Sequence, residues 1–173
     1  MSTEKKLDEL YELIDEMKIA LMTTRRADGM METRPMATQQ QEADADLWFV
    51  TNIDTHKVDQ LEDDPNISLG YYNEDTREWV SVSGVATVSQ DRDKIRELYA
   101  EDWKIWFKDE GGERDGGPND PRIALIFVDT KVVNYLKKKH STPRTLFEMG
   151  KAYVTGERPD IGRKQHLSES ELG

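Results

Sequence analysis

The stretch from residue 79 to residue 88, WVSVSGVATV, carries a long strand pattern from which the class of fold can be argued. Apolar residues alternate with small polar ones along it, which is the pattern of a β-strand with one buried face. Gly84 interrupts the middle of this strand, and a glycine inside a strand indicates a bulge or a bend. The stretch therefore predicts a long strand in a sheet that curls as a barrel does.

Shorter strand patterns lie on both sides of this stretch. Residues 19–24 and 30–38 are separated by an Asp-Gly turn signal, so they predict a β-hairpin. Pro35 lacks an amide donor, which places the second of these strands at a sheet edge, at a bulge or where the ladder opens. We expect strands over residues 19–24, 30–38, 47–51, 67–72, 79–88, 123–128 and 131–136, and helices over residues 7–17 and 56–63 and after Asp91.

The order of these elements indicates the class of fold. The strands follow one another in hairpin order and do not alternate with helices, which favours a mainly β fold, an antiparallel barrel with peripheral helices. The length of 173 residues fits one domain over residues 1–173. From about residue 155 the chain is rich in Gly, Pro and polar residues, so we expect a weakly ordered tail unless it packs on a partner subunit.

Composition limits the compartment and the partners. The chain has no cysteine, which excludes disulfides and thiolate sites and suits a reducing compartment. The acidic start lacks the features of an export signal, and no apolar run approaches the roughly 20 residues that cross a bilayer. We expect a soluble, cytoplasmic protein with no membrane partner. The formal net charge of −11 also argues against nucleic acid as a partner, because its phosphates need an excess of Lys and Arg.

Thr55, His56 and Lys57 form a short basic cluster that stands out against this acidic background. They begin a helical pattern directly after the strand at 47–51. The first amides of a helix lack internal partners and lie at the positive end of its dipole, so a hydroxyl and an ammonium beside them would complete a phosphate cradle. The alternative is that Thr55 only caps the helix while the two basic side chains are solvated.

Arg34 is a second candidate for the same anion site. It precedes Pro35 and Met36, and in a hairpin-ordered sheet it could lie beside Val50 and Thr51. An arginine offers phosphate a planar fork of donors, and a neighbouring proline leaves backbone groups free for a ligand.

Other residues give weaker signals. Trp106 belongs to an aromatic cluster at 103–107 that is typical of a core or a subunit contact, although a flat ligand also favours such rings. The three histidines have no metal-ligand spacing, so no metal site is expected. The glycine-rich segment 111–117 is not followed by Lys-Ser or Lys-Thr, so we interpret it as a mobile surface loop and not as a P-loop.

Several of these motifs, taken together and in order, resemble one family. The resemblance covers roughly residues 7 to 160, and the family is the general stress protein branch of the pyridoxamine 5′-phosphate oxidase-like flavoproteins. The matching segments are 34–36 (RPM), 47–51 (LWFVT), 55–57 (THK), 61–69 with Pro65-Asn66, 80–84 (VSVSG), 106–107 (WF) and 120–121 (DP).

The resemblance implies a split β-barrel that forms a homodimer, with one FMN in each of two clefts at the interface. It assigns the FMN phosphate to Arg34, Thr55 and Lys57, with His56 where many relatives have arginine. The backbone of residues 35–36 and 50–51 would line the ribityl chain and the ring edge. FAD is a second cofactor that the same phosphate site could accept.

Departures from the family pattern bear on the activity. Trp79 stands where the true oxidases have a glutamine that reaches the flavin, and their C-terminal Trp and Arg pattern has no counterpart in residues 156–173. Pyridoxamine 5′-phosphate oxidase activity is therefore not expected. We expect an FMN-binding general stress protein that acts as a flavin-dependent oxidoreductase or a flavin reservoir. The alternative is a non-catalytic split barrel that binds another cofactor, such as FAD, deazaflavin or haem, or a partner peptide.

Overall fold

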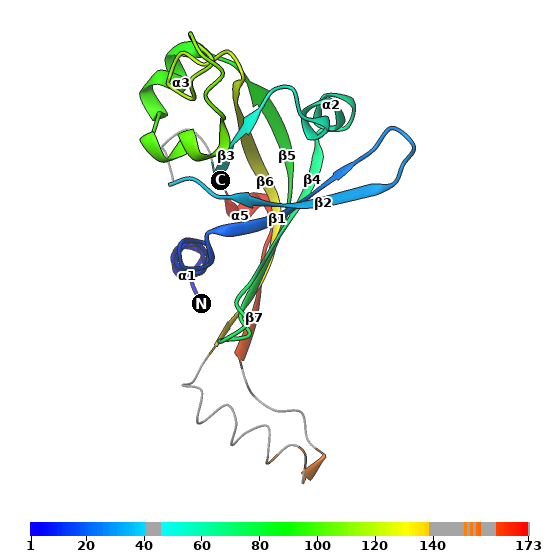
Figure 1. The fold of residues 1–173 in the computed structure, drawn as a ribbon. Helices are drawn as coiled ribbons and strands as arrows, with labels where there is room; N and C mark the ends of the chain where they lie inside the picture. The colour runs from blue at the N-terminus through cyan, green and yellow to red at the C-terminus, as the bar shows by residue number, and fades with distance from the viewer. Residues whose placement is uncertain (41–45, 139–150, 152, 154, 157–161, 173) are drawn as a thin grey trace.

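A computed structural model describes residues 1–40, 46–138 and 162–172, together with residues 151, 153, 155 and 156. Within these residues the strands form one antiparallel sheet in the order β2-β1-β4-β5-β6-β3, and β7 pairs with β6 (Figure 1). The strands are β1 (Ile19–Arg25), β2 (Met31–Ala37), β3 (Leu47–Asn52), β4 (Asn66–Tyr72), β5 (Trp79–Ser89), β6 (Ile123–Lys138) and β7 (Gly162–Leu167). The helices are α1 (Thr3–Met17), α2 (His56–Asp63), α3 (Arg92–Leu98), the 3₁₀ helix η1 (Glu101–Trp106) and α5 (Glu169–Leu172).

The mainly β prediction is confirmed, and the sheet curls. A backbone hydrogen bond of 3.0 Å from Gln39 to Trp48 joins the segment after β2 to β3, although these two strands lie at opposite ends of the strand order. Pro35 lies on the edge strand β2, opposite Leu21 of β1. In Figure 1, α1 and α2 lie on opposite sides of the β1–β2 hairpin.

The prediction of two strands over 123–128 and 131–136 is wrong, because β6 is continuous from Ile123 to Lys138. Ser83 pairs with Val132 and Gly84 with Thr130, so the ladder skips Lys131. This bulge lies next to the gap at residues 129–130 between the two expected strands, and opposite Gly84, where the sequence indicated a bend.

The expectation of a weakly ordered tail does not hold for residues 162–172. They form β7, which pairs with the second half of β6, and the short helix α5. Two ion pairs hold α5: Lys6 with Glu171 at 2.6 Å and Lys131 with Glu169 at 2.6 Å. The polar composition of this segment predicted weak order, but its charged side chains are held by ion pairs. The partners in these pairs lie far away in sequence, so a local pattern does not reveal them.

The core has two parts, on the two faces of β3 and the first half of β6. Leu47 and Phe49 contribute to the larger part, which also takes the apolar stripe of α1. Trp48 and Val50 face the other way, into a smaller cluster under α3 and η1. Because both faces of β3 are covered, its sequence is a continuous apolar run without alternation.

A buried ion pair between Asp120 and Arg122 organises the loop before β6. The Arg122 Nη2 lies 2.6 Å from the Asp120 Oδ2, and the same arginine donates to the carbonyls of Lys108 and Arg114 at 2.9 and 3.1 Å. Burial acts to raise the pKa of Asp120, but hydrogen bonds from Arg122 and from the Gly116 amide lower it to about 2. The interpretation of 111–117 as a mobile surface loop is therefore incomplete, because residues 116 and 117 are buried.

The space at Gly84 leads to a prediction. A Cβ added there would lie 2.6 Å from the Asp129 carbonyl oxygen and 2.9 Å from the Val128 Cγ1, so the neighbouring strand must shift. We expect Gly84→Ala to lower the free energy of unfolding by about 1–3 kcal/mol, as overpacking does. Urea unfolding at fixed protein concentration measures it. Thr87→Ala, at an exposed position of the same strand, is the control and should cost less than about 1 kcal/mol; an equal loss in both variants would contradict the packing argument.

In the described parts of the chain, we find no helix with the length and apolar character that crossing a membrane requires.

Candidate functional site

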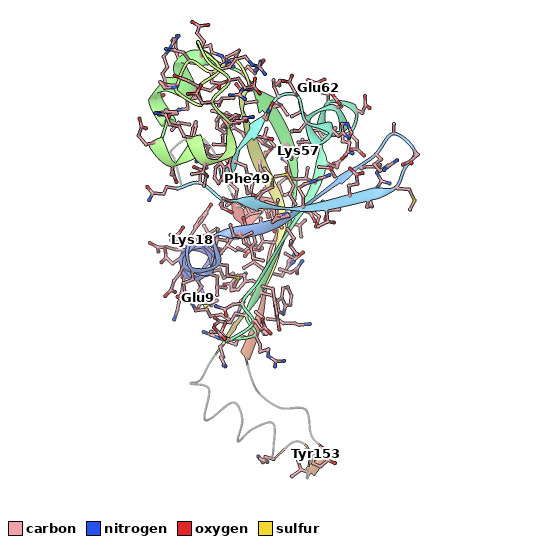
Figure 2. All side chains as sticks on the ribbon, viewed as in Figure 1. Glu9, Lys18, Phe49, Lys57, Glu62 and Tyr153 are labelled. Atoms are coloured by element: carbon pink, nitrogen blue, oxygen red, sulfur yellow. The ribbon has the colours of Figure 1, made fainter. Side chains whose placement is uncertain are left out.

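A cleft of about 420 Å³ lies where the ends of β2 and β3 meet the first turn of α2 and the end of η1. Figure 2 shows Lys57 where α2 begins, beside the β1–β2 hairpin. The cleft is lined by Ile19, Pro35, Met36, Ala37, Val50, Thr51, Asn52, Thr55, Lys57, Trp106 and Phe107. Its volume is within the range of about 300–1,000 Å³ that small-molecule sites occupy.

The fold brings together most of the residues that the sequence analysis singled out. Seven of them line this one cleft, and they come from four strands or helices and the turn before α2: Pro35, Met36, Val50, Thr51, Thr55, Lys57 and Trp106. Strand pairing alone does not explain this, because β2 and β3 lie at opposite ends of the strand order. The curl of the sheet makes them neighbours.

Lys57 and two threonines form the polar end of the cleft. The Lys57 Nζ donates to the Thr51 Oγ1 at 3.0 Å and to the Thr55 Oγ1 at 3.2 Å. The Thr55 hydroxyl donates to the Asn52 carbonyl at 2.7 Å, and it makes no capping bond to α2. An ammonium has three donors, so one remains for a ligand after the two threonines are served.

Burial acts on both cations near the cleft, Lys57 and Arg34. Burial lowers the pKa of Lys57, and the nearby positive charge of Arg34 lowers it further. Burial also lowers the pKa of Arg34, while Glu32 acts in the opposite direction. A bound anion would reverse both shifts, because it favours the charged form of each group.

Arg34 lies behind the cleft and is not among its lining residues. Its Nη1 donates to the Thr24 Oγ1 at 2.5 Å, and its Nη2 donates to the Gln60 Oε1 at 3.2 Å and the Glu32 Oε2 at 3.3 Å. The guanidinium therefore joins β1, β2 and α2. The positive charge of Arg34 contributes to the lowered pKa of Lys57, but the N–H donors of Arg34 are directed to these side chains.

His56 and Trp106 differ from each other in their relation to the cleft. His56 is exposed and does not line it, whereas Trp106 lines it with 46% of its surface exposed. Phe107, which the sequence placed with Trp106 in one cluster, is buried beside it and carries the Arg122 guanidinium 5.6 Å from its ring centre. Among the described residues, no group of three His, Asp or Glu side chains is placed to hold a metal ion.

Sequence reasoning missed the residues around Arg34. Thr24, Glu32 and Gln60 have no motif of their own, and only the fold brings them together. One signal was available, because Gln60 follows Lys57 by three positions on a helical pattern and so lies on the same face of α2.

The described part of the chain has two further hollows, of which one adjoins this cleft and the other lies apart from it. A hollow of about 650 Å³ shares Ile19, Ala37 and Trp106 with the cleft and adds polar side chains of α1 and η1, Asp15, Lys18 and Asp102. Lys57 lines the cleft but not this hollow. The cleft therefore continues from an apolar section into a polar one.

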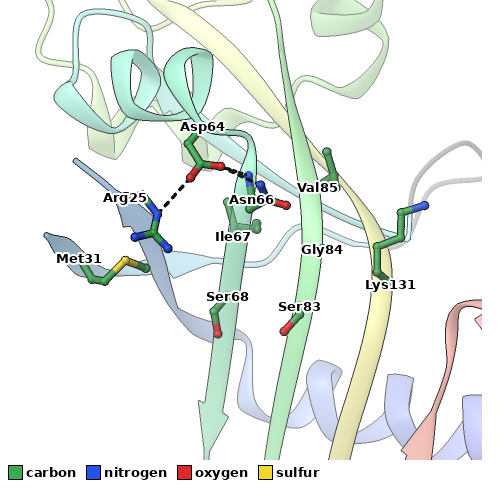
Figure 3. A pocket seen from close by; sticks show the side chains of 10 residues that line it. All are labelled: Arg25, Met31, Asp64, Asn66, Ile67, Ser68, Ser83, Gly84, Val85 and Lys131. Atoms are coloured by element: carbon green, nitrogen blue, oxygen red, sulfur yellow. Dashed lines mark hydrogen bonds and ion pairs between the residues drawn. The ribbon is translucent and has the colours of Figure 1, made fainter. Parts of the chain in front are cut away.

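The other hollow, of about 290 Å³, lies on the open face of the sheet (Figure 3). Ser68, Ser83 and Gly84 are among its lining residues. Arg25 at its rim pairs with Asp64 at 3.1 Å, and Lys131 on the other side pairs with Asp129 and Glu169. Because both cations already have carboxylate partners, we assign no ligand to it.

Comparison with known proteins identifies the class. The chain matches the family described as "Pyridoxamine 5′-phosphate oxidase like" over residues 5–160. It belongs to this family, which confirms the resemblance seen in the sequence and, with the mainly β sheet, the predicted split β-barrel.

Individual relatives support this assignment. Protein bli-3 of Neurospora crassa is 33% identical over 172 residues, which are 98% of this chain and 82% of that protein. A protein related to general stress protein 26 from Clostridium acetobutylicum has a TM-score of 0.70 at 17% identity, with 100% of both chains covered. The general stress FMN/FAD binding protein of Xanthomonas citri has a TM-score of 0.64 at 18% identity and covers 80% of this chain and 92% of its own.

Proposed function

We propose that this chain binds FMN in the cleft beside Lys57 and acts as a flavin-dependent oxidoreductase or a flavin reservoir. The observation that carries the proposal is the Lys57 ammonium, held by Thr51 and Thr55 at one end of an otherwise largely apolar cleft. The relative from Xanthomonas citri, named as an FMN/FAD binding protein, supports it.

The residues present fit this cofactor. Lys57 and Thr55, with Arg34 behind them, would hold the phosphate, and the backbone at 35–36 and 50–51 would accompany the ribityl chain. The side chains of Ile19, Met36 and Trp106 give the ring an apolar wall that excludes water. When bound, FMN supplies hydride or electron transfer, and the protein supplies position and electrostatics.

The polar hollow next to the ring end would receive the second reactant. Ile19, Ala37 and Trp106 belong to both spaces, so a molecule in the hollow would lie against the ring end of the cleft. We do not propose pyridoxamine 5′-phosphate as this reactant. Trp79 replaces the glutamine of the true oxidases, and in this chain it is half-buried on β5 with the Lys164 ammonium 5.8 Å from its ring centre.

We propose further that two copies of the chain pair through the open face of the sheet. Large apolar side chains of this face are about half exposed, at 49% for Ile19, 51% for Leu21 and 58% for Tyr72, and the central positions are small. An apolar patch of this kind marks an interaction surface. Ile19 also lines the cleft, so a second copy on this face would lie next to the flavin.

The first test is an absorbance spectrum of the purified protein, followed by chromatography of the molecule that heat releases and by light scattering. We expect a flavin band, FMN at about one per chain, and a mass of two chains. A colourless protein that also fails to bind added FMN would overturn the proposal. Release of FAD would keep the site and change the cofactor.

Storage of flavin is the second candidate function, since the side chains proposed to flank the ring, those of Ile19, Met36 and Trp106, include no acid or base. Steady oxidation of NADH or NADPH by the FMN-loaded protein would support the oxidoreductase. Tight binding of FMN without turnover would support the reservoir.

A further inference from the structure

The fork of Arg34 is occupied by three side chains. Nη1 is directed to Thr24 and, at 3.4 Å, to the Met22 carbonyl, and Nη2 is directed to Gln60 and Glu32. The two terminal nitrogens of a guanidinium carry four N–H donors in a fixed plane. With these partners in place, an anion that approaches the fork must displace one of them.

Two of the partners cannot leave easily. Thr24 is fully buried and Gln60 is 9% exposed. The Thr24 hydroxyl donates to the Gln60 Oε1 at 2.5 Å, so that one oxygen accepts from both Thr24 and Arg34. Breaking this pair of contacts would leave buried polar groups without partners, which costs about 1–3 kcal/mol for each group.

Glu32 is the partner that can leave. Its side chain is 37% exposed, and its contact with Arg34 is the longest of the three side-chain contacts, at 3.3 Å. It also pairs with Arg26 at 3.0 Å, and its Oε2 accepts from the Gln60 Nε2 at 2.6 Å, so Glu32 has two other partners when Arg34 is released. Hydrogen bonds from Gln60 and Arg26 lower the pKa of Glu32, and the group is therefore charged at neutral pH.

We propose that Glu32 occupies the Arg34 fork as an internal anion and that a phosphate-bearing ligand reaches Arg34 by displacing it. This inference rests on the proposed function, since FMN is the ligand that would do so. Glu32 then sets specificity: it weakens the binding of a phosphorylated flavin and leaves the binding of riboflavin, which has no phosphate, unchanged.

The test uses Glu32→Gln, which removes the charge and keeps the shape. We expect FMN to bind about two- to tenfold more tightly to this variant than to the wild type, with no change for riboflavin, both measured by quenching of flavin fluorescence. Asp28→Asn is the matched control. Asp28 also pairs with Arg26, at 3.1 Å, and lies in the same hairpin, but its carboxylate accepts from Arg26 and the Met30 amide and not from Arg34. It adds the same net charge, and we expect it to leave the FMN affinity unchanged.

Two outcomes would overturn the inference. Unchanged or weaker FMN binding by Glu32→Gln would mean that Glu32 orients Arg34 and does not compete for it. An equal gain in Asp28→Asn would mean that only the net charge matters.

Inorganic phosphate separates this inference from the proposed function. Phosphate should raise the melting temperature of Glu32→Gln more than that of the wild type or of Asp28→Asn, whether or not a flavin binds. If FMN binds none of the three proteins but this difference is observed, the flavin proposal fails and the internal anion stands. If neither FMN nor phosphate binds, both fail.

Discussion

The double variant Arg34→Ala/Lys57→Ala is expected to bind FMN about 10²–10⁴-fold more weakly than the wild type. Each substitution removes a charged donor for the phosphate, and such hydrogen bonds contribute about 1.5–3 kcal/mol each. The positive charge of Arg34 adds to the effect of burial in lowering the pKa of Lys57, so we expect one bound anion to interact with both groups. Fluorescence titration with FMN measures the loss.

His56→Ala is the matched control for this prediction. His56 is adjacent to Lys57 in the first turn of α2, but it is exposed and does not line the cleft. We expect its FMN affinity to stay within about twofold of the wild type. A double variant that retains wild-type affinity would show that the phosphate lies elsewhere, and a large loss in His56→Ala would show that the cradle includes the imidazole.

Arg122→Ala is expected to lower the free energy of unfolding by about 3–5 kcal/mol, because it leaves the carboxylate of Asp120 buried without its partner. Asp120 is fully buried and Arg122 is 4% exposed. The arginine also serves two backbone carbonyls, which would lose their donor. Urea unfolding, with the midpoint and slope compared between variants, measures the effect.

Arg114→Ala is the control for the Arg122 prediction. Arg114 pairs with Glu110 at 2.7 Å in the same loop, but both side chains are 45% exposed. Exposed pairs contribute about 0–1 kcal/mol, so this variant should remain close to the wild type. If the free energy of unfolding falls by no more in Arg122→Ala than the small amount expected for Arg114→Ala, the loop tolerates the unpaired Asp120 carboxylate, for instance by admitting water.

Local sequence patterns were sufficient to predict most of the sheet. Alternation and turn signals found the hairpin β1–β2 and the long strand β5, since each depends on neighbours close in sequence. The continuity of β6 was missed because the bulge at Lys131 depends on pairing with β5. β7 was missed for a similar reason: its residues are mostly polar, and their partners on β6, on α1 and at Trp79 of β5 lie far away in sequence.

Some residues of the candidate site could likewise be predicted from local sequence patterns, and others could not. Thr55 and Lys57 were found from the physics of a helix start that follows a strand, and both line the cleft. The contacts of Arg34 depend first on the register of β1 against β2, which places Met22 opposite Arg34 and Thr24 opposite Glu32. They depend also on the packing of α2 on β1, which brings Gln60 to Thr24. No local pattern contains that information.

The length of β6 has a consequence for how the chain folds. β6 pairs with β5 along most of its length, with β3 through its first half and with β7 through its second. The residues of β3 therefore pair with residues more than seventy positions later in the chain; Leu47, for example, pairs with Val128. Contacts of such long separation slow folding, because a large loop must close before they form. During synthesis the edge of β3 that pairs with β6 therefore has no strand partner until β6 has emerged, and an unpaired apolar edge of this kind favours aggregation.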